Sequence, residues 1–149
     1  MATISVRRAV SSDLTHIVHH YGPGDSPWDP FADLAKLQGI PLEGLIVAEV
    51  QGQYAGFLYW FVGENPWFDP RIDRYAHIVE VQVVERYRGR GVGKSLLIYA
   101  LERIKEKSIA AIYVDTTEDN AVARRLYESA GFHPFSRTIH YRWEPGEDR

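Results

Sequence analysis

The residues with the clearest chemical potential lie in a glycine-rich turn, Arg88-Gly-Arg-Gly-Val-Gly-Lys94, and at Tyr127. A β-branched run that ends near Val84 precedes the turn, and an amphipathic helical pattern begins at once after it. Glycines let phosphate oxygens reach backbone amides, and the amino end of a helix adds partial positive charge. The turn is therefore suited to bind a pyrophosphate; the alternative is a plain strand-to-helix turn whose glycines serve close packing.

Two common nucleotide-binding motifs do not fit this turn. An ATP-binding P-loop needs a glycine five residues before the Gly-Lys-Ser that Gly93 begins, and position 88 is arginine. The dinucleotide fingerprint fails because Gly89-x-Gly91 is followed three residues later by Lys94 instead of glycine. A nucleotide hydrolase or a dinucleotide-dependent dehydrogenase is thus not indicated.

Two segments together resemble the GNAT acetyltransferase superfamily. The first is Val83-x-x-x-Tyr-Arg-Gly-Arg-Gly-Val-Gly-Lys-x-Leu-Leu97, and the second is Asn120-x-x-Ala-x-x-Leu-Tyr-Glu-Ser-x-Gly-Phe132. Glu85 replaces a proline that is common in the family. The order of the expected elements is similar to that family across nearly the whole chain, so the resemblance implies a mixed α/β fold with a mostly antiparallel sheet.

The resemblance also implies acetyl-CoA as the cofactor. Amides of the glycine-rich turn would hold its pyrophosphate, backbone groups of Val81 and Val83 would pair with the pantetheine arm, and Asn120 would hydrogen-bond that arm. The full set implied to contact the cofactor is Val81, Val83, Val84, Arg88, Gly89, Arg90, Gly91, Val92, Gly93, Lys94, Ser95, Asn120 and Tyr127.

Transfer of an acetyl group to an amine needs a base for the ammonium and an acid for the departing thiolate. Tyr127 is the expected acid, although a helix tyrosine can also serve packing alone. His77 is the first candidate base: it lies six residues before Val83, and the two-residue period of a strand places both on one face, with Glu80 on the opposite face as the reserve candidate. A purely structural His77 is equally compatible.

The chain has no cysteine, which excludes a covalent acetyl-cysteine intermediate. Direct attack of a bound amine is the simpler route. Aromatic and acidic residues predict where that amine binds: Trp28, Trp67, Phe68, Asp69 and Tyr75 are the candidate pocket residues. The histidines of residues 16–20 have helical spacing but lack an acidic or cysteine partner in a metal-site pattern, so no metal site is expected.

The pattern of apolar residues predicts one domain over residues 1–149, with about seven strands and about four helices. The expected strands span 4–9, 45–50, 54–62, 77–84, 109–115, 132–135 and 139–143, the last two as a hairpin. The expected helices span 11–21, 29–39, 91–107 and 117–130, and residues 144–149 form a loose tail.

Charge and composition narrow the partners. The net charge is −3, with 5 Lys/Arg and 11 Asp/Glu in residues 1–85 against 12 and 9 in residues 86–149. This asymmetry suits a cationic acceptor beside an anionic cofactor, or it reflects solvated surface charge. A small-molecule amine is the expected partner, with a protein amine or a non-catalytic acyl-CoA sensor as alternatives. Nucleic acid and membrane are not expected, a homodimer stays open, and the absence of a signal sequence or spanning segment favours the cytoplasm.

Overall fold

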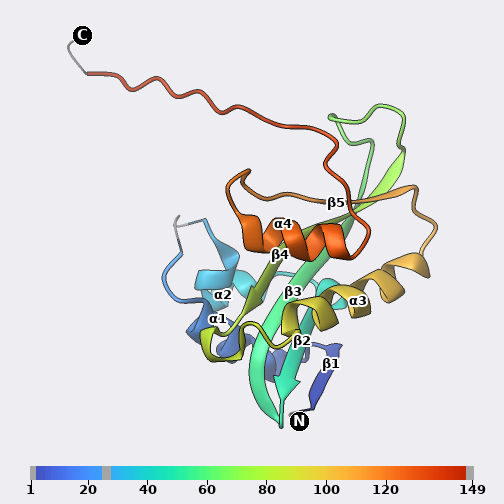
Figure 1. Cartoon of the computed structure of the whole chain (residues 1–149). Helices are drawn as coiled ribbons and strands as arrows, with labels where there is room; N and C mark the ends of the chain where they lie inside the picture. Colours follow the sequence, from blue (N-terminus) through green and yellow to red (C-terminus); the bar gives the residue numbers. More distant parts are fainter. Residues whose placement is uncertain (1–2, 25–27, 147–149) are drawn as a thin grey trace.

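The structure, a computed structural model, describes residues 3–24 and 28–146. Its centre is a five-stranded sheet in the order β1-β2-β3-β4-β5 (Figure 1). The strands are β1 (Ile4–Arg8), β2 (Leu45–Val50), β3 (Gln53–Glu64), β4 (Arg74–Val83) and β5 (Ala111–Val114). The first four pair antiparallel with their chain neighbours, and only β5 pairs parallel, with β4. The mixed, mostly antiparallel sheet that the sequence predicts is confirmed.

Four α-helices and four short 3-10 turns accompany this sheet in the described part of the chain. The helices are α1 (Leu14–Tyr21), α2 (Leu34–Leu37), α3 (Val92–Lys105) and α4 (Ala121–Ser129). The 3-10 turns are η1 (Ser11–Asp13), η2 (Pro30–Ala32), η3 (Leu42–Gly44) and η4 (Glu85–Tyr87). None of the described helices has the length and apolar character needed to span a membrane.

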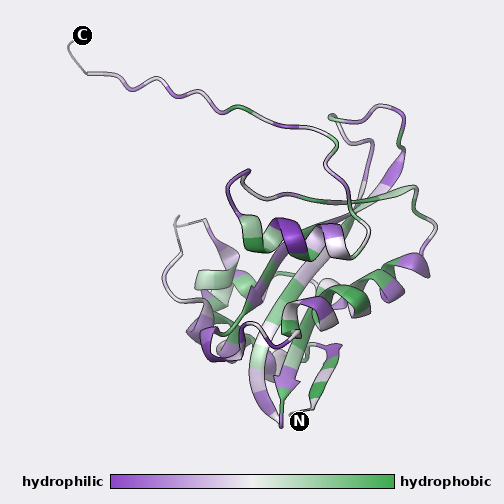
Figure 2. Cartoon of the chain, in the orientation of Figure 1, coloured by the Kyte–Doolittle hydropathy of each residue, from purple (hydrophilic) through white to green (hydrophobic). Residues whose placement is uncertain are grey.

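The sheet separates two hydrophobic cores, because alternate residues of each strand point to opposite faces. Residues of β2 and β3 such as Ile46 and Leu58 pack with Leu96 and Leu97 of α3, and α4 adds its apolar side to this core. On the other face, Phe57 packs with α1, α2 and η2. In Figure 2, α3 and α4 alternate hydrophobic and hydrophilic residues along their length, as helices that cover a sheet do.

The predicted hairpin of residues 132–135 and 139–143 is wrong. Residues 132–144 form neither strand nor helix, and the chain runs away from the sheet in Figure 1. Ile139, Tyr141 and Trp143 are 74%, 91% and 80% exposed, so their alternation of apolar and polar residues finds no core to face. A two-residue period predicts a strand only where a partner strand and a buried face exist, and five strands result instead of seven. Residues 147–149 of the predicted tail lie outside the described residues.

The predicted helix over residues 29–39 is interrupted. Asp29 caps the first turn as expected, because its carboxylate accepts a hydrogen bond from the Phe31 amide at 3.0 Å. Asp33 then caps a second start, accepting from the amides of Ala35 and Lys36. An extended residue at 33 divides the segment, since a capping side chain competes with continuation of the helix.

The packing of α3 makes a direct prediction about stability. Leu97 is fully buried under this helix, whereas its neighbour Ile98 is 45% exposed. We expect Leu97→Ala to lower the free energy of unfolding by about 2–5 kcal/mol, because it leaves a cavity, and Ile98→Ala to cost less than about 1 kcal/mol. Urea unfolding followed by circular dichroism measures both. Equal losses in the two variants would contradict this packing.

Candidate functional site

The site begins where β4 and β5 part. The two strands pair from Tyr75 with Ala111 to Ile78 with Val114, and β4 then continues to Val83 without a neighbour on that side. On its other side β4 remains paired with β3 as far as Val83 opposite Gly56. A wedge therefore opens in the sheet, with backbone groups of β4 along one wall.

Backbone groups of Val81 and Val83 face this wedge. The Val84 amide donates to the Ala55 carbonyl of β3 at 2.8 Å, and groups of successive residues point to opposite sides of a strand. Val83, and Val81 two residues earlier, therefore direct N–H and C=O away from β3. The Arg88 Nε donates to the Val83 carbonyl at 3.1 Å, so this arginine ties the turn to the strand. Backbone in such a wedge can pair with an extended chain of amides.

A bulge in β4 sets which side chains flank the wedge. The register with β3 shifts between Tyr59 opposite Glu80 and Trp60 opposite Ile78, which leaves Val79 as the extra residue. A bulge reverses the in-and-out alternation beyond it. The side chains of Ala76 and Ile78 before it, and of Val81 and Val83 after it, therefore face the same core, the one that α3 covers.

The expectation that His77 shares a face with Val83 is wrong for this reason. His77 lies against Phe61, with ring centroids 5.5 Å apart, on the face opposite Val83. The predicted placement of Glu80 opposite Val83 is confirmed, since Glu80 lies across from Tyr59. Both candidate bases consequently lie on one face of β4.

The glycine-rich turn adopts the conformation that anion binding needs. Gly89 and Gly91 have φ of +76° and +87°, which glycine tolerates best, and Gly91 is the N-cap of α3. The first amide bonded within α3 is that of Ser95, which donates to the Gly91 carbonyl at 3.0 Å. The amides of Val92, Gly93 and Lys94 precede it and have no acceptor in the helix, so their N–H groups and the helix dipole favour an anion here.

Two arginines of the turn are organised by Tyr87, which the sequence analysis did not single out. The guanidinium carbons of Arg86 and Arg90 lie 4.9 and 5.8 Å from the centre of its ring. Cation–π contacts keep such side chains extended over the ring and limit their freedom. Tyr87 thereby holds two positive charges beside the free amides.

Tyr127 and Glu80 are brought into one electrostatic environment. Burial raises the pKa of the Tyr127 hydroxyl, and the carboxylates of Glu80 and Asp115 raise it further, so it carries its proton at neutral pH. Burial, with a contribution from Asp29, raises the pKa of Glu80 to about 6. At neutral pH the Tyr127 hydroxyl can therefore donate a proton, and the Glu80 carboxyl, with a pKa of about 6, can accept one.

His77 contacts the same region through Asp115. Its Nε2 lies 3.5 Å from Asp115 Oδ2, just beyond the end of β5. Asp29 is held by the Tyr21 hydroxyl, which donates to it at 2.7 Å. The sequence analysis did not identify Asp29 and Asp115 as residues of the site. Neither belongs to a motif, and only the fold brings them near Glu80, Tyr127 and His77.

Asn120 has a visible structural task. It is the N-cap of α4, and its Oδ1 accepts a hydrogen bond from the Ala123 amide at 3.1 Å. Both backbone groups of Val84 are also engaged, with Ala55 and with Tyr87, which leaves Val84 to shape the turn. Gly131, with φ of +100°, ends α4 as predicted and returns Phe132 to within 6.1 Å of the Tyr127 ring.

The predicted acceptor residues divide into two groups. Trp28 is 82% exposed and lies beside Lys36 of α2. Phe68 and Tyr75 lie with Tyr113 in an aromatic cluster at the base of the loop of residues 65–73, and Trp67 packs on Phe68 from the outside. This cluster also includes Phe135, which the sequence analysis assigned to a strand.

Asp69 is buried in that loop and already has partners. The Tyr113 hydroxyl donates to its Oδ2 at 2.8 Å, and Arg71 Nε lies 3.3 Å from Oδ1. The hydrogen bond from Tyr113 lowers the pKa of Asp69, and Arg71 lowers it further, against the opposing effect of burial. Its charge therefore anchors the loop to β5.

Within residues 3–24 and 28–146, no group of three or more His, Asp or Glu side chains has the geometry of a metal site. The histidines of α1 instead stack on Tyr54, with His16 and His20 at 5.9 and 5.2 Å from its ring centre.

Comparison with known proteins identifies the family. The sequence model described as "Acetyltransferase (GNAT) family" matches residues 12–132. The chain therefore belongs to the GNAT acetyltransferase family.

Several relatives share this membership at modest identity. A mycothiol acetyltransferase of Frankia casuarinae is 30% identical over 75% of the chain, but the match spans only 34% of that protein. A putative [ribosomal protein bS18]-alanine N-acetyltransferase of Bacillus subtilis is 26% identical over 97% of the chain and 90% of its own length. An aminoglycoside N-acetyltransferase AAC(6′)-Iy in complex with CoA has the same fold, with a TM-score of 0.78, 20% identity and 96% of each chain covered.

The raised pKa of Glu80 predicts how stability depends on pH. Glu80 binds its proton more tightly in the folded protein than in the unfolded chain. The stabilising contribution of this proton to the free energy of unfolding is therefore fully present below about pH 4.5 and is lost as the pH rises through about 6. Glu80→Gln should therefore gain stability relative to the wild type over this range, by about 1 kcal/mol once partial solvation is allowed for.

Denaturant unfolding of both proteins at pH 4.5, 5.5 and 7 measures the difference. Glu85→Gln, at an exposed position of η4, is the matched control and should show no such trend. A constant difference between wild type and Glu80→Gln across the three pH values would contradict the raised pKa.

Proposed function

We propose that this protein transfers the acetyl group of acetyl-CoA to a primary amine by direct attack while both are bound. The observation that carries the proposal is the edge of β4 that has no partner strand beyond Ile78 in the described residues, together with the free amides at the start of α3. Beyond the effect of burial, Glu80 raises the pKa of Tyr127, so these two side chains interact. Membership of the acetyltransferase family supports this reaction class.

The residues present fit coenzyme A. The amides of Val92, Gly93 and Lys94 with the arginines around Tyr87 would bind its pyrophosphate, and the backbone of Val81 and Val83 would pair with the amides of its pantetheine arm. An added Cβ at Gly91 would meet nothing within 4 Å, so the surface above this turn is open to a ligand. Acetyl-CoA would supply an activated thioester; the chain's own residues have to manage two protons.

Glu80 is the proposed base. An amine with a pKa of about 10.4 costs roughly 4–5 kcal/mol to deprotonate at pH 7, and a carboxylate with a pKa of about 6 can accept that proton directly or through water. Tyr127, protonated at neutral pH, would donate a proton to the departing thiolate. His77, which pairs with Asp115, is the alternative base. It lies on the same face of β4 as Glu80.

The acceptor is proposed to be a small-molecule amine, which the aminoglycoside enzyme of similar fold and the mycothiol acetyltransferase relatives support as a class. The terminal amine of a polypeptide is the second candidate, because the Bacillus subtilis relative and an N-alpha-acetyltransferase of Sulfolobus acidocaldarius match along most of their lengths. The aromatic cluster of Phe68, Tyr75 and Tyr113 is packed on itself, which also favours an acceptor that binds on an open surface.

Release of CoA thiol distinguishes these acceptors and tests the reaction. Small amines, polyamines, aminoglycosides and peptides with free amino ends would be compared, and the absence of cysteine keeps the thiol background low. Turnover with one class establishes the enzyme and its acceptor together. Cofactor binding without turnover on any class would overturn catalysis in favour of an acyl-CoA sensor.

The turn predicts that Gly91→Asp weakens acetyl-CoA binding by at least about 100-fold, or roughly 2.7 kcal/mol, because a carboxylate would oppose the pyrophosphate. Gly91→Asn is the matched control, because it puts a side chain of similar size on the same left-handed backbone without the charge. Its loss of acetyl-CoA affinity should be much smaller. Isothermal titration calorimetry measures both. Unchanged affinity in Gly91→Asp would contradict the cofactor assignment.

The acid role predicts that Tyr127→Phe lowers kcat by about 100-fold, because the thiolate then leaves without a proton donor. Cofactor affinity should change less than about threefold, or 0.7 kcal/mol, since the ring is kept. Tyr141→Phe, at a position that is 91% exposed, serves as the control. A kcat equal to that of the wild type would show that Tyr127 is not the acid.

A further inference from the structure

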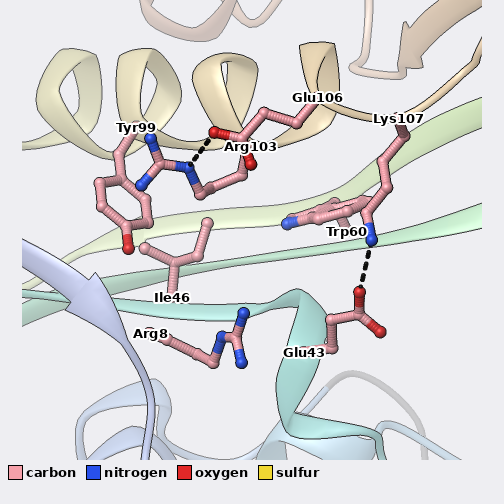
Figure 3. A pocket seen from close by; sticks show the side chains of 8 residues that line it. All are labelled: Arg8, Glu43, Ile46, Trp60, Tyr99, Arg103, Glu106 and Lys107. Carbon is pink, nitrogen blue, oxygen red and sulfur yellow. Dashed lines mark hydrogen bonds and ion pairs between the residues drawn. The ribbon is translucent and has the colours of Figure 1, made fainter.

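A cavity lies at the carboxyl end of α3, away from the glycine-rich turn at the amino end of this helix. It has a volume of about 70 Å³ and is bounded by β1, η3, β2, β3 and the last turns of α3 (Figure 3). Its lining residues are Arg8, Glu43, Ile46, Trp60, Tyr99, Arg103, Glu106 and Lys107. None of them belongs to the candidate functional site, so the cavity needs its own explanation.

The indole N–H of Trp60, a residue in the wall of this cavity, is a donor without a partner among the described residues. Trp60 is only 4% exposed, and its Nε1 has no hydrogen-bond partner. In Figure 3 the nitrogen edge of the ring faces the space between Arg103 and Arg8. A buried tryptophan N–H normally finds a partner, and leaving it unpaired is destabilising. The cavity therefore favours a ligand that brings an acceptor.

Two arginines line the same cavity, Arg8 from β1 and Arg103 from α3. Arg8, at the end of β1, makes no side-chain hydrogen bond or ion pair within the described residues. Arg103 is held over the Tyr99 ring at 4.8 Å and lies 3.7 Å from Glu102 Oε2 and 3.5 Å from Glu106 Oε1, while its buried Nε makes no hydrogen bond within the described residues. Guanidinium groups bind the two oxygens of a carboxylate with well-matched geometry.

The charge of the lining selects the valence of the ligand. Three basic and two acidic side chains line the cavity, and Lys107 is already paired with Glu43 at 2.8 Å. The resulting single positive charge balances a monoanion, whereas a dianion would meet the carboxylates of Glu43 and Glu106 at close range. Ile46 and the Tyr99 ring add an apolar wall that suits a short alkyl group.

We propose that this cavity is a binding site for a small monocarboxylate, held by the Trp60 indole N–H and the guanidinium groups of Arg8 and Arg103. Its headgroup would satisfy the buried indole donor, and its alkyl part would lie against Ile46 and Tyr99. The site does not depend on the proposed acetyl transfer, because no residue is shared between them.

Acetate is the probe, and the indole N–H resonances of the uniformly ¹⁵N-labelled full chain are the readout. The four tryptophans give one such resonance each, and Trp60→Phe identifies that of Trp60 by its loss. Sodium acetate would be titrated against sodium chloride and sodium phosphate at constant ionic strength. We expect a saturable shift of the Trp60 resonance with acetate, and no comparable shift for the highly exposed Trp67.

Arg8→Gln should weaken acetate binding by about tenfold or more, as expected for loss of a charged hydrogen-bond partner. Arg142→Gln is the matched control, since that arginine is exposed and pairs with Glu144 instead. A thermal shift with acetate that is present in the wild type and absent in Trp60→Phe gives a second, independent readout.

Three results would overturn the proposal. A Trp60 resonance that does not shift on addition of acetate would mean that the cavity holds only water. An equal response to chloride or phosphate would refute selection for a carboxylate. Unchanged affinity in Arg8→Gln would remove the guanidinium from the site.

Discussion

Strand pairing that stops at Ile78 and Val114 is the constraint on which the site depends. Had β5 continued alongside β4, the backbone of Val81 and Val83 would be consumed by the sheet, and no wedge would open. Because pairing stops, backbone groups of Val81 and Val83 take no part in strand pairing on that side, and the amides at the start of α3 have no acceptor in the helix. Polar backbone left unpaired beside a core is costly, so water or a bound ligand has to satisfy these groups.

The bulge at Val79 determines which side chains of β4 lie beside the wedge. It keeps apolar side chains turned to α3 on both sides of the shift, while Glu80 and His77 come to the opposite face. There Glu80 lies near Asp29, whose carboxylate and the surrounding apolar residues raise its pKa to about 6. Without the bulge, Glu80 would share the core-facing side of β4 with Ala76 and Ile78, and His77 would lie on the other side.

The sequence predicted correctly those features that depend on local interactions. The positive φ of Gly89 and Gly91, the cap at Asp29 and the end of α4 at Gly131 follow from residue type alone. The face of His77 was predicted wrongly, because a strict two-residue period was applied along the whole strand although the core-facing residues change from even positions (Ala76, Ile78) to odd ones (Val81, Val83). Asp115 and Tyr87 were missed because their roles come from neighbours distant in sequence or from ring stacking. The terminal hairpin failed because alternation at 139–143 carries no information about whether a partner strand is present.

The single parallel pair in the sheet has a consequence for the order of assembly. Strands β2 to β4 are joined by short connections, whereas α1 and α2 separate β1 from β2, and β5 reaches β4 only after the chain has crossed over through α3. Contacts across such a crossover close a longer loop and form more slowly than those of a hairpin. The wedge is therefore completed by one of the last pairings to form, and a chain stalled before that step would hold most of its core without the means to recognise its ligand.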